Sequence, residues 1–529
     1  MMIFDWRFAN GDLLARLLGV LGNGLQIAIL SALVLGMRCA NYADVFVDGK
    51  IYFVDADCYS RMSRVGLVAE NPGTVVRQHE FENYPAGIRP HTTAPLDYLI
   101  VGLGTALRPF TAQPLDLAGA IISPLLALLG GWFLWWWSRP VAAPGRLLLL
   151  LVYALSGILV HGTALGRPDQ QSLLIITLLL ALAAEWRLQV KATRGWSIVS
   201  GISWGLALWI SLYEPLVLFG GLILFSIFKA RTMFTVPTRR TGWWIFLAII
   251  LFAAAVERRL PGWPGAEPFF ANWSATIGEL RGLGLTNPSW LYWVGGLLLV
   301  SPVLLAIAIV RRAIAWPCMG LLALTFCLTI WQARWGYFFA LVFLLTVPAQ
   351  LCVVRPRWLA WPALALALCP FLFFWDARLW PNETMALREA EDRRTMIEWR
   401  ATASSLAGKE RAPVLTPWWL APATAYWSGQ PAVAGSSHES LPGIVATARF
   451  FLSTSFQEAS EILREHGVKW VLIEDGEQVV ENSAAILGQT APEDALGWKL
   501  DHAPSQVPRF LVLARQTGAC KIYKVGITR

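Results

Sequence analysis

The residues best suited to chemistry begin with two closely spaced aspartates. Asp55 and Asp57 lie in VDADCYSRMSRV, and two carboxylates at this spacing can bind one divalent cation. Arg61 and Arg64 follow them, and guanidinium groups pair readily with phosphate oxygens. The segment therefore predicts a site for a metal ion and a phosphate, with an ordinary solvated loop as the alternative.

Other charged residues recur at wide intervals along the chain. Arg167 and Asp169 lie in LGRPDQQS, and Glu214 lies in SLYEPL. Glu279 follows in ATIGELRGLG, and Arg334 comes at the end of a later apolar run. Each also has a structural explanation, as a solvated loop charge or, for Arg334, as a side chain that reaches out of the membrane.

Three weaker signals accompany these charges. His91 ends the turn-rich segment ENYPAGIRPH. Thr276 stands three residues before Glu279, which is the spacing of a helix capping box. Trp418 and Trp419 form a pair in TPWWLAPATAYWSG, where they would serve equally well as core or interface aromatics.

Long apolar runs must position all of these residues. Of the 529 residues, 56% are hydrophobic, and the mean hydropathy of +0.51 is far above that of a soluble globular protein. Apolar runs of about twenty residues, the length that crosses a bilayer, recur from Leu17 to Trp375. The expected spans are 17–37, 117–137, 147–163, 170–186, 196–212, 215–229, 243–257, 291–310, 313–331, 336–353 and 358–375. We therefore expect a polytopic α-helical membrane protein with roughly 11–13 transmembrane helices.

The basic residues indicate which side of the bilayer each loop faces. Lys and Arg cluster in alternate connections, as the positive-inside rule requires of cytoplasmic loops. These clusters account for the net charge of +8, so no nucleic-acid partner is expected. The same count places the candidate site residues together on the outer face. It requires that the apolar segment 94–110, which carries Asp97, is an interfacial or re-entrant helix and not a further span.

The composition changes after Trp375. Charged residues become about twice as frequent, which favours a soluble fold. A helical segment, FQEASEILREHG (456–467), precedes the β-rich run VKWVLIE (468–474), and Gly467 suits the end of the helix. The expected division is a membrane domain over 1–375, whose outer loops 38–116 and 258–290 carry site residues, and an extracytoplasmic α/β domain over 376–529.

Taken in order, these motifs resemble those of a known family. The order is D-x-D-x-Y in the first outer loop, Y-P-x-G before a His, G-x-x-D two spans later, T-I-x-E in a long outer loop, and a W-W pair opening an outer domain. The catalytic subunit of oligosaccharyltransferase has the same series, and the resemblance extends over about residues 13–475. It implies a GT-C fold and an enzyme that transfers a glycan from a polyprenyl diphosphate to an acceptor asparagine.

The resemblance also implies roles for individual residues. Asp57, with Asp55 as a competing candidate, is similar to the aspartate that binds the metal ion and contacts the acceptor amide. Asp169 is similar to a second metal ligand, and Glu279 to the glutamate that helps to hold the acceptor nitrogen and the metal. Arg334 resembles the arginine that holds the lipid diphosphate. A divalent cation, Mg²⁺ or Mn²⁺, and that arginine would neutralise the leaving diphosphate.

The remaining candidates take their roles from the same pattern. Arg167 and His91 are expected to join Arg334 in binding the lipid diphosphate. The residues expected to contact the acceptor are Thr276, Glu214, Trp418 and Trp419.

Two positions depart from the family pattern. Gln171 stands where an acid or His usually follows the second-loop aspartate, so the affinity for metal is expected to differ. Leu420 follows the Trp pair where the family has Asp, which accepts a hydrogen bond from the Ser or Thr of the acceptor sequon. Leu has no acceptor atom, so either a protein or a glycan remains open as the acceptor.

The sequence therefore predicts a metal-assisted membrane glycosyltransferase. We expect it in a bacterial inner membrane, with the C-terminal domain in the periplasm, a polyprenyl-linked glycan as donor, and protein asparagine as the first choice of acceptor. One alternative is a transferase that uses polyprenyl-phosphate sugars to modify lipid or polysaccharide. A transporter, which would favour polar residues at the middle of spans, and a non-catalytic scaffold are the alternatives from other classes.

Overall fold

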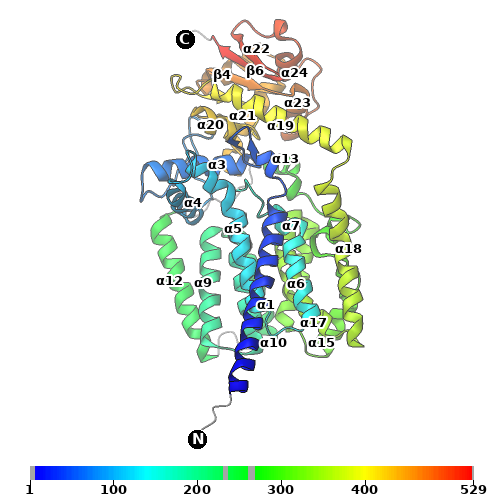
Figure 1. Cartoon of the computed structure of the whole chain (residues 1–529). Coiled ribbons are helices and arrows are strands. Elements are labelled where there is room, and N and C mark those ends of the chain that lie inside the picture. Colours follow the sequence, from blue (N-terminus) through cyan, green and yellow to red (C-terminus); the bar gives the residue numbers. More distant parts are fainter. Residues whose placement is uncertain (1–5, 230–235, 260–268, 527–529) are drawn as a thin grey trace.

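A bundle of long helices carries a smaller mixed domain at one end (Figure 1). The computed structural model describes residues 6–229, 236–259 and 269–526. Within them, the segments long and apolar enough to cross a membrane are Leu21–Arg38, Pro114–Trp137, Gln170–Val190, Pro237–Glu257, Ala333–Cys352 and Arg357–Leu379. Their helices are α1 (Trp6–Arg38), α5 (Pro114–Trp137), α8 (Gln170–Val190), α12 (Arg240–Glu257), α17 (Gly336–Cys352) and α18 (Ala360–Leu379). Each expected span coincides with a helix or with a pair of helices, so the predicted polytopic fold is confirmed.

Shorter helices complete the bundle, and two of the expected spans are broken. The shorter helices are α6 (Ala143–Leu155), α7 (Gly157–His161), α9 (Arg194–Ile210), α10 (Tyr213–Lys229), α14 (Ser289–Val294), α15 (Ser301–Val310) and α16 (Trp316–Trp331). One break lies at Ser156, between α6 and α7. The other lies at Gly295, whose φ of 83° leaves the helical region and is accessible to glycine. The Ser156 hydroxyl donates to the Trp293 carbonyl at 2.6 Å, so the two breaks lie together and exchange a hydrogen bond inside the bundle.

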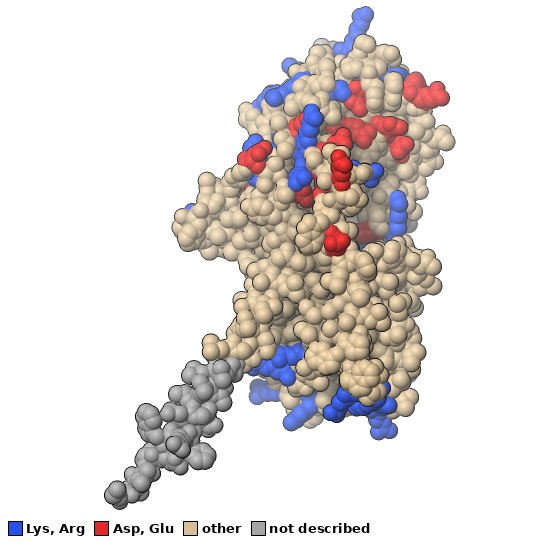
Figure 2. Space-filling view, turned by 45° about the vertical axis from the view of Figure 1, so that its right-hand side comes forward, with Lys and Arg blue, Asp and Glu red and all other residues tan. Residues whose placement is uncertain are grey.

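Charge is distributed unevenly over the surface. Figure 2 shows a broad band without charged side chains along the bundle, with basic residues at its far end and mixed acidic and basic residues beside the smaller domain. This separation agrees with the predicted sidedness, in which the basic loops lie inside and the candidate site lies outside.

Short elements lie between the bundle and the smaller domain. After α1 come α2 (Tyr42–Val45), the antiparallel pair β1 (Phe46–Val47) and β2 (Lys50–Ile51), and then α3 (Ala56–Glu70) and α4 (Ala94–Leu107). Helix α4 has 14 residues, hence a length of about 21 Å, and is too short to cross a hydrocarbon core of about 30 Å. This length agrees with the expectation that segment 94–110 does not span.

The C-terminal domain is a small α/β unit. It begins with α19 (Glu383–Ser404), and its four-stranded sheet has the order β3-β4-β6-β5. The strands are β3 (Val414–Leu415), β4 (Trp470–Ile473), β5 (Leu511–Thr517) and β6 (Cys520–Val525), with only β3 and β4 parallel among these pairs. The helices are α20 (Ala421–Ser428), α21 (Leu441–Leu452), α22 (Phe456–Glu465), α23 (Gly476–Leu487) and α24 (Leu496–His502). The predicted helix-then-strand unit is α22 followed by β4, and Gly467 between them has a φ of 63°.

One loop joins the membrane domain to this α/β unit. We call residues 79–91 the clasp loop. Its Phe81 carbonyl accepts from the Ala432 amide at 2.9 Å, and its Tyr84 amide donates to the Ala432 carbonyl at 3.1 Å. The Asn83 side chain accepts from the Gly443 amide at 2.9 Å. The two halves of the molecule are therefore held together by backbone hydrogen bonds next to the candidate site.

Candidate functional site

The first two aspartates lie at the start of α3. Asp55 is the N-cap residue, and its Oδ1 accepts from the Cys58 amide at 3.0 Å. Its Oδ2 lies 3.2 Å from Nη2 of the buried Arg167, which comes from the loop before α8. Burial alone would raise the pKa of Asp55, but the Arg167 guanidinium and the Cys58 hydrogen bonds hold it below its usual value. Asp55 is therefore a fixed anion paired with Arg167.

Asp57 lies in a different environment, in the first turn of the same helix. Water reaches its side chain, yet enough protein surrounds it for burial to be the first cause of its raised pKa. The carboxylates of Asp55 and Asp169 raise the pKa further, with a smaller contribution from Glu279, and the result is about 7. A hydrogen bond with Ser436 opposes the rise. Carboxylates from three outer loops therefore converge on Asp57.

Glu279 and Arg334 come from later parts of the chain. Glu279 lies in the 3₁₀ turn η2 (Gly278–Leu280), and Arg334 lies in η4 (Ala333–Trp335). Burial raises the pKa of Glu279, the Arg334 charge opposes this, and the Asp169 charge adds to it. Nη2 of Arg334 lies 2.7 Å from Oε1 of Glu214, which is in the first turn of α10. The site thus combines several carboxylates with two arginines, each of which is paired with one carboxylate, Arg167 with Asp55 and Arg334 with Glu214.

The arrangement can hold a divalent cation only in part. Within residues 6–229, 236–259 and 269–526, the group of three His, Cys, Asp or Glu residues whose ligand atoms lie within 4.8 Å of one another is His91, His438 and Glu439. The carboxylates around Asp57 therefore do not form a complete protein cage.

His91 meets the C-terminal domain. Its Nδ1 lies 3.0 Å from Oε1 of Glu439, and its amide donates to the same oxygen at 2.7 Å. Nδ1 of His438 lies 3.4 Å from Oε2 of Glu439. Burial lowers the pKa of His91, but the Glu439 carboxylate outweighs this and raises it, with Asp57 adding to the rise. His91 is therefore part of the same charged region.

The other residues expected to contact the acceptor have partners within the protein. Trp418 donates from Nε1 to Asn482 at 3.0 Å and packs against Trp273, and Trp419 packs beside the core of the C-terminal domain. The Thr276 hydroxyl donates to the Trp273 carbonyl at 2.7 Å at the end of α13 (Phe270–Thr276), so a capping box with Glu279 is excluded. Their role toward an acceptor stays a prediction.

Arg61 and Arg64 are not phosphate ligands in this structure. Arg61 Nη1 lies 2.7 Å from one oxygen of Asp97, and Arg64 Nη2 lies 2.6 Å from the other. All three side chains are buried, with Asp97 at 0% exposure. The expectation drawn from the spacing after the two aspartates is therefore wrong, because the helix turns both arginines toward α4.

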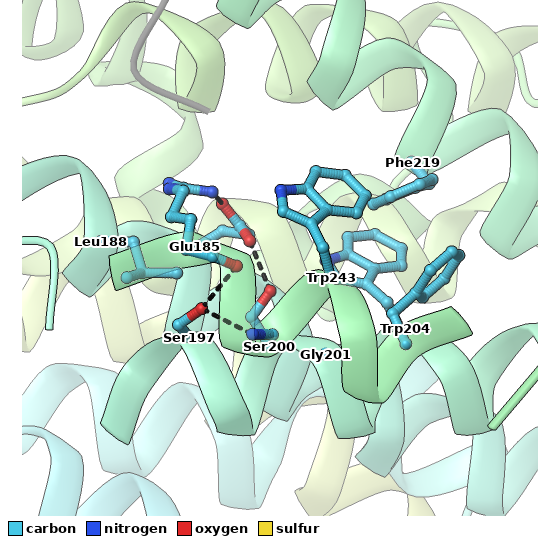
Figure 3. Close-up of a pocket in the computed structure, with 11 residues that line it drawn as sticks. Glu185, Leu188, Ser197, Ser200, Gly201, Trp204, Phe219 and Trp243 are labelled. Atoms are coloured by element: carbon cyan, nitrogen blue, oxygen red, sulfur yellow. Dashed lines mark hydrogen bonds and ion pairs between the residues drawn. The ribbon is translucent and has the colours of Figure 1, made fainter. Parts of the chain in front are cut away.

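A separate cavity lies away from these residues. It is a small pocket, partly open to solvent, among α8, α9, α10 and α12 (Figure 3). Arg239 Nη1 lies 2.9 Å from Oε2 of Glu185, and the Ser200 hydroxyl donates to the other oxygen at 2.5 Å. Trp204, Phe219 and Trp243 form its aromatic side. None of the candidate site residues lines it.

Comparison with solved structures identifies the fold. The oligosaccharyltransferase of Archaeoglobus fulgidus, tethered to an acceptor peptide with an NVT sequon, superposes with a TM-score of 0.66 at 15% identity, over 90% of this chain and 71% of that one. ArnT from Cupriavidus metallidurans, in the apo state, superposes with a TM-score of 0.56 at 14% identity, over 96% and 98% of the two chains. The chain has the GT-C fold. No protein-family model and no curated protein matches its sequence.

The sequence pointed to most of the residues that the fold brings together. Asp55, Asp57, Asp169, Glu279 and Arg334 act on one another electrostatically, and the roles expected for them from the motifs stay predictions.

Two further contributors lie beside these residues and could not be assigned from the sequence. Nε2 of His161 lies 3.2 Å from Nη1 of Arg167, and Nδ1 of His161 lies 2.7 Å from the Tyr337 hydroxyl. Glu439 meets His91 across 348 positions of sequence, a separation that leaves no local pattern.

Proposed function

We propose that this chain is a membrane glycosyltransferase that takes its sugar from a polyprenyl-linked donor on the outer face of a bacterial inner membrane. The observation that carries the proposal is the convergence of Asp55, Asp57 and Asp169 with Arg167 and Arg334 at one end of an apolar bundle. Carboxylates and arginines beside a membrane surface could bind and stabilise a lipid-linked phosphate as it leaves. The GT-C fold supports the same reading. The C-terminal domain would lie in the periplasm.

Structures with this fold support a lipid-linked donor. The archaeal oligosaccharyltransferase AglB was solved with an inhibitory peptide and a dolichol-phosphate. ArnT was solved with undecaprenyl phosphate. The archaeal enzyme was also solved with Zn and sulfate. For this chain we infer a polyprenyl phosphate or diphosphate donor, with protein asparagine as the first choice of acceptor.

Each charged residue would have a distinct part in the transfer. Arg334, held by Glu214, would bind the phosphate that leaves, together with His91. Arg167, held by Asp55, would stabilise negative charge that develops beside it during the transfer. Asp57, with a pKa of about 7, would accept a hydrogen bond or a proton from the acceptor nucleophile.

A divalent cation fits beside these residues. Asp57, Asp169 and Glu279 would hold Mg²⁺ or Mn²⁺ together with donor oxygens, and the bound ion would offset the charge of the departing phosphate. Burial first, and then repulsion by Asp55 and Asp169, raises the pKa of Asp57, and a cation at this position would relieve that repulsion.

A second acceptor class is favoured by Leu420. Leu420 cannot accept a hydrogen bond from a Ser or Thr hydroxyl. Transfer of a single sugar from a polyprenyl phosphate to a lipid or polysaccharide is therefore the second candidate.

The test is a transfer assay with the purified full chain in lipid vesicles. The donors are a polyprenyl-diphosphate glycan and a polyprenyl-phosphate monosaccharide, each offered with a peptide, a glycolipid or a polysaccharide. We expect transfer from one donor, and a fall of roughly 100-fold or more for Asp57→Asn and Asp169→Asn.

The matched control is Asp44→Asn, which removes a carboxylate from the same outer loop. Asp44 pairs with Arg393 at 3.5 Å at the surface, away from the Asp57 cluster, so its loss should leave transfer unchanged. Equal activity in Asp57→Asn and Asp44→Asn would refute the proposal.

A further inference from the structure

His91, His438 and Glu439 form a cluster that the carboxylates around Asp57 do not require. His91 ends the clasp loop of the membrane domain, whereas His438 and Glu439 lie in the 3₁₀ turn η6 (His438–Ser440) of the C-terminal domain. The two imidazole rings are stacked with their centroids 5.3 Å apart. Nδ1 of both rings faces Oε2 of Glu439, and Nδ1 of His91 also lies 3.0 Å from Oε1. The cluster therefore forms only when both domains are in place.

The distances within the cluster match those around a tetrahedral ion. Zinc binds His nitrogen and carboxylate oxygen at about 2.0–2.2 Å, which places neighbouring ligand atoms about 3.4 Å apart. Nδ1 of His91 and Nδ1 of His438 lie 3.3 Å and 3.4 Å from the same oxygen, Oε2 of Glu439. One ligand atom from each of the three residues falls within 4.8 Å of the other two. Small side-chain rotations would suffice to close the group around one ion.

The ligand types and their exposure favour zinc over magnesium. Imidazole nitrogens suit Zn²⁺, whereas Mg²⁺ prefers oxygen ligands alone. The side chains of His91, His438 and Glu439 are 36%, 21% and 11% exposed, so an ion can reach them from solvent. We propose that His91, His438 and Glu439 bind a zinc ion at the junction of the two domains.

This site deepens the proposed function, on which its catalytic meaning depends. Two histidines and one glutamate are a ligand set that leaves the fourth position of zinc open for water or another oxygen ligand. Both Asp57 and Arg334 act electrostatically on His91, so that open position would lie in the same charged region. The oxygen ligand that best fits beside an arginine is a phosphate of the donor.

The test measures metal content and affinity in the purified full chain. The protein is stripped with a chelator, exchanged into buffer, and titrated with Zn²⁺ or with Mg²⁺ while bound metal is counted by elemental analysis. With excess Mg²⁺ present to occupy the carboxylates around Asp57, we expect a single zinc ion per chain that Mg²⁺ does not displace. His438→Ala and Glu439→Gln should each weaken zinc binding by more than the roughly 10- to 100-fold that loss of an outer-shell partner costs.

The control is His466→Ala, which removes another histidine of the same domain from the same junction. His466 Nδ1 lies 2.9 Å from the Tyr84 carbonyl of the clasp loop, outside the cluster, so zinc binding should be retained. Glu439→Gln keeps the size of the side chain, and its melting curve checks that the variant is folded. A folded wild-type chain that takes up no zinc, or wild-type affinity in both cluster variants, would overturn the site.

The same variants separate this inference from the proposed function. Zinc uptake without any glycosyl transfer would support the zinc site and refute the proposed function. Transfer that depends on Asp57, in a chain that does not bind zinc, would support the proposed function and refute the zinc site.

Discussion

Arg334 and Glu214 form an ion pair at the outer ends of two membrane helices, with 2.7 Å between Nη2 and Oε1. Ser211 donates to the second oxygen of Glu214 at 2.6 Å, so both carboxylate oxygens are engaged. Glu214 is only 2% exposed. In this arrangement it fixes the direction of the guanidinium group, and the acceptor contact expected for Glu214 from the sequence has no support from its geometry.

Glu214→Gln is expected to lower the turnover number by about 10- to 100-fold, because a misplacement of about 1 Å in a positioning group has effects of this size. The Michaelis constant for the lipid donor should rise as well, since Arg334 would hold its phosphate less firmly. Steady-state kinetics with varied donor measure both. Ser211→Ala, which removes only the neutral partner, is the control and should have a smaller effect. Unchanged kinetics in Glu214→Gln would contradict a positioning role.

Asp97→Asn is expected to destabilise the protein by about 3–5 kcal/mol, because it leaves Arg61 and Arg64 as buried charges without their counterion. The melting temperature of the full chain in detergent measures this. Asp494→Asn is the control, because Asp494 pairs with Lys499 at the surface and its loss should cost little. Equal melting temperatures for the two variants would show that the buried pair is not needed for stability.

At limiting Mg²⁺, transfer is expected to increase as pH rises through about 7, because protons compete with the cation for Asp57, whose pKa is raised to that value in the absence of the ion. Stability should change in the opposite direction. The folded state holds this proton up to about pH 7, whereas the unfolded chain loses it near 3.8, so stability falls as pH rises through that window.

Asp57→Asn removes this linkage and should melt above wild type at pH 8. The gain is on the order of 1 kcal/mol, since solvent screens an exposed carboxylate. Melting curves at pH 5 and pH 8 measure it, and a difference that shrinks toward pH 8 would exclude the raised pKa.

Leu420→Asp is expected to create a preference for Thr two residues after the acceptor in a peptide. Wild type should discriminate little between Thr and Ala there, and the variant by roughly tenfold to a hundredfold. Leu420 is half-buried and packs against the main hydrophobic core, so a melting curve must confirm that the variant is folded. Rates with paired peptides measure the preference. Strict use of Thr by wild type would mean that another polar group reads this position.

Hydropathy predicted the membrane helices because their length and composition are dictated by the bilayer. The breaks at Ser156 and Gly295 were not predicted, since an average over twenty residues does not register a local change of backbone direction. Those breaks depend on a hydrogen bond between segments 137 positions apart.

The candidate site was predictable where chemistry follows from local spacing. Asp55 and Asp57 fall at a helix start, and the motif locates them directly. The expectation that Arg61 and Arg64 bind phosphate was wrong, because helical periodicity places them on the face that carries the buried Met62 and Val65. A charge on such a face needs a buried partner, and nothing near them in the sequence identifies Asp97 as that partner.

The clasp loop also constrains how the protein is made. Asn83 leaves the ribosome 360 residues before Gly443, and its side chain accepts a hydrogen bond from the Gly443 amide. Likewise, His91 leaves the ribosome 348 residues before its partner Glu439. During synthesis the loop therefore waits outside the membrane while most of the bundle is inserted and its remaining partners are translated. Assembly of the charged region is one of the last events in biogenesis, and a nascent chain that stalls before residue 432 holds an open, incomplete centre.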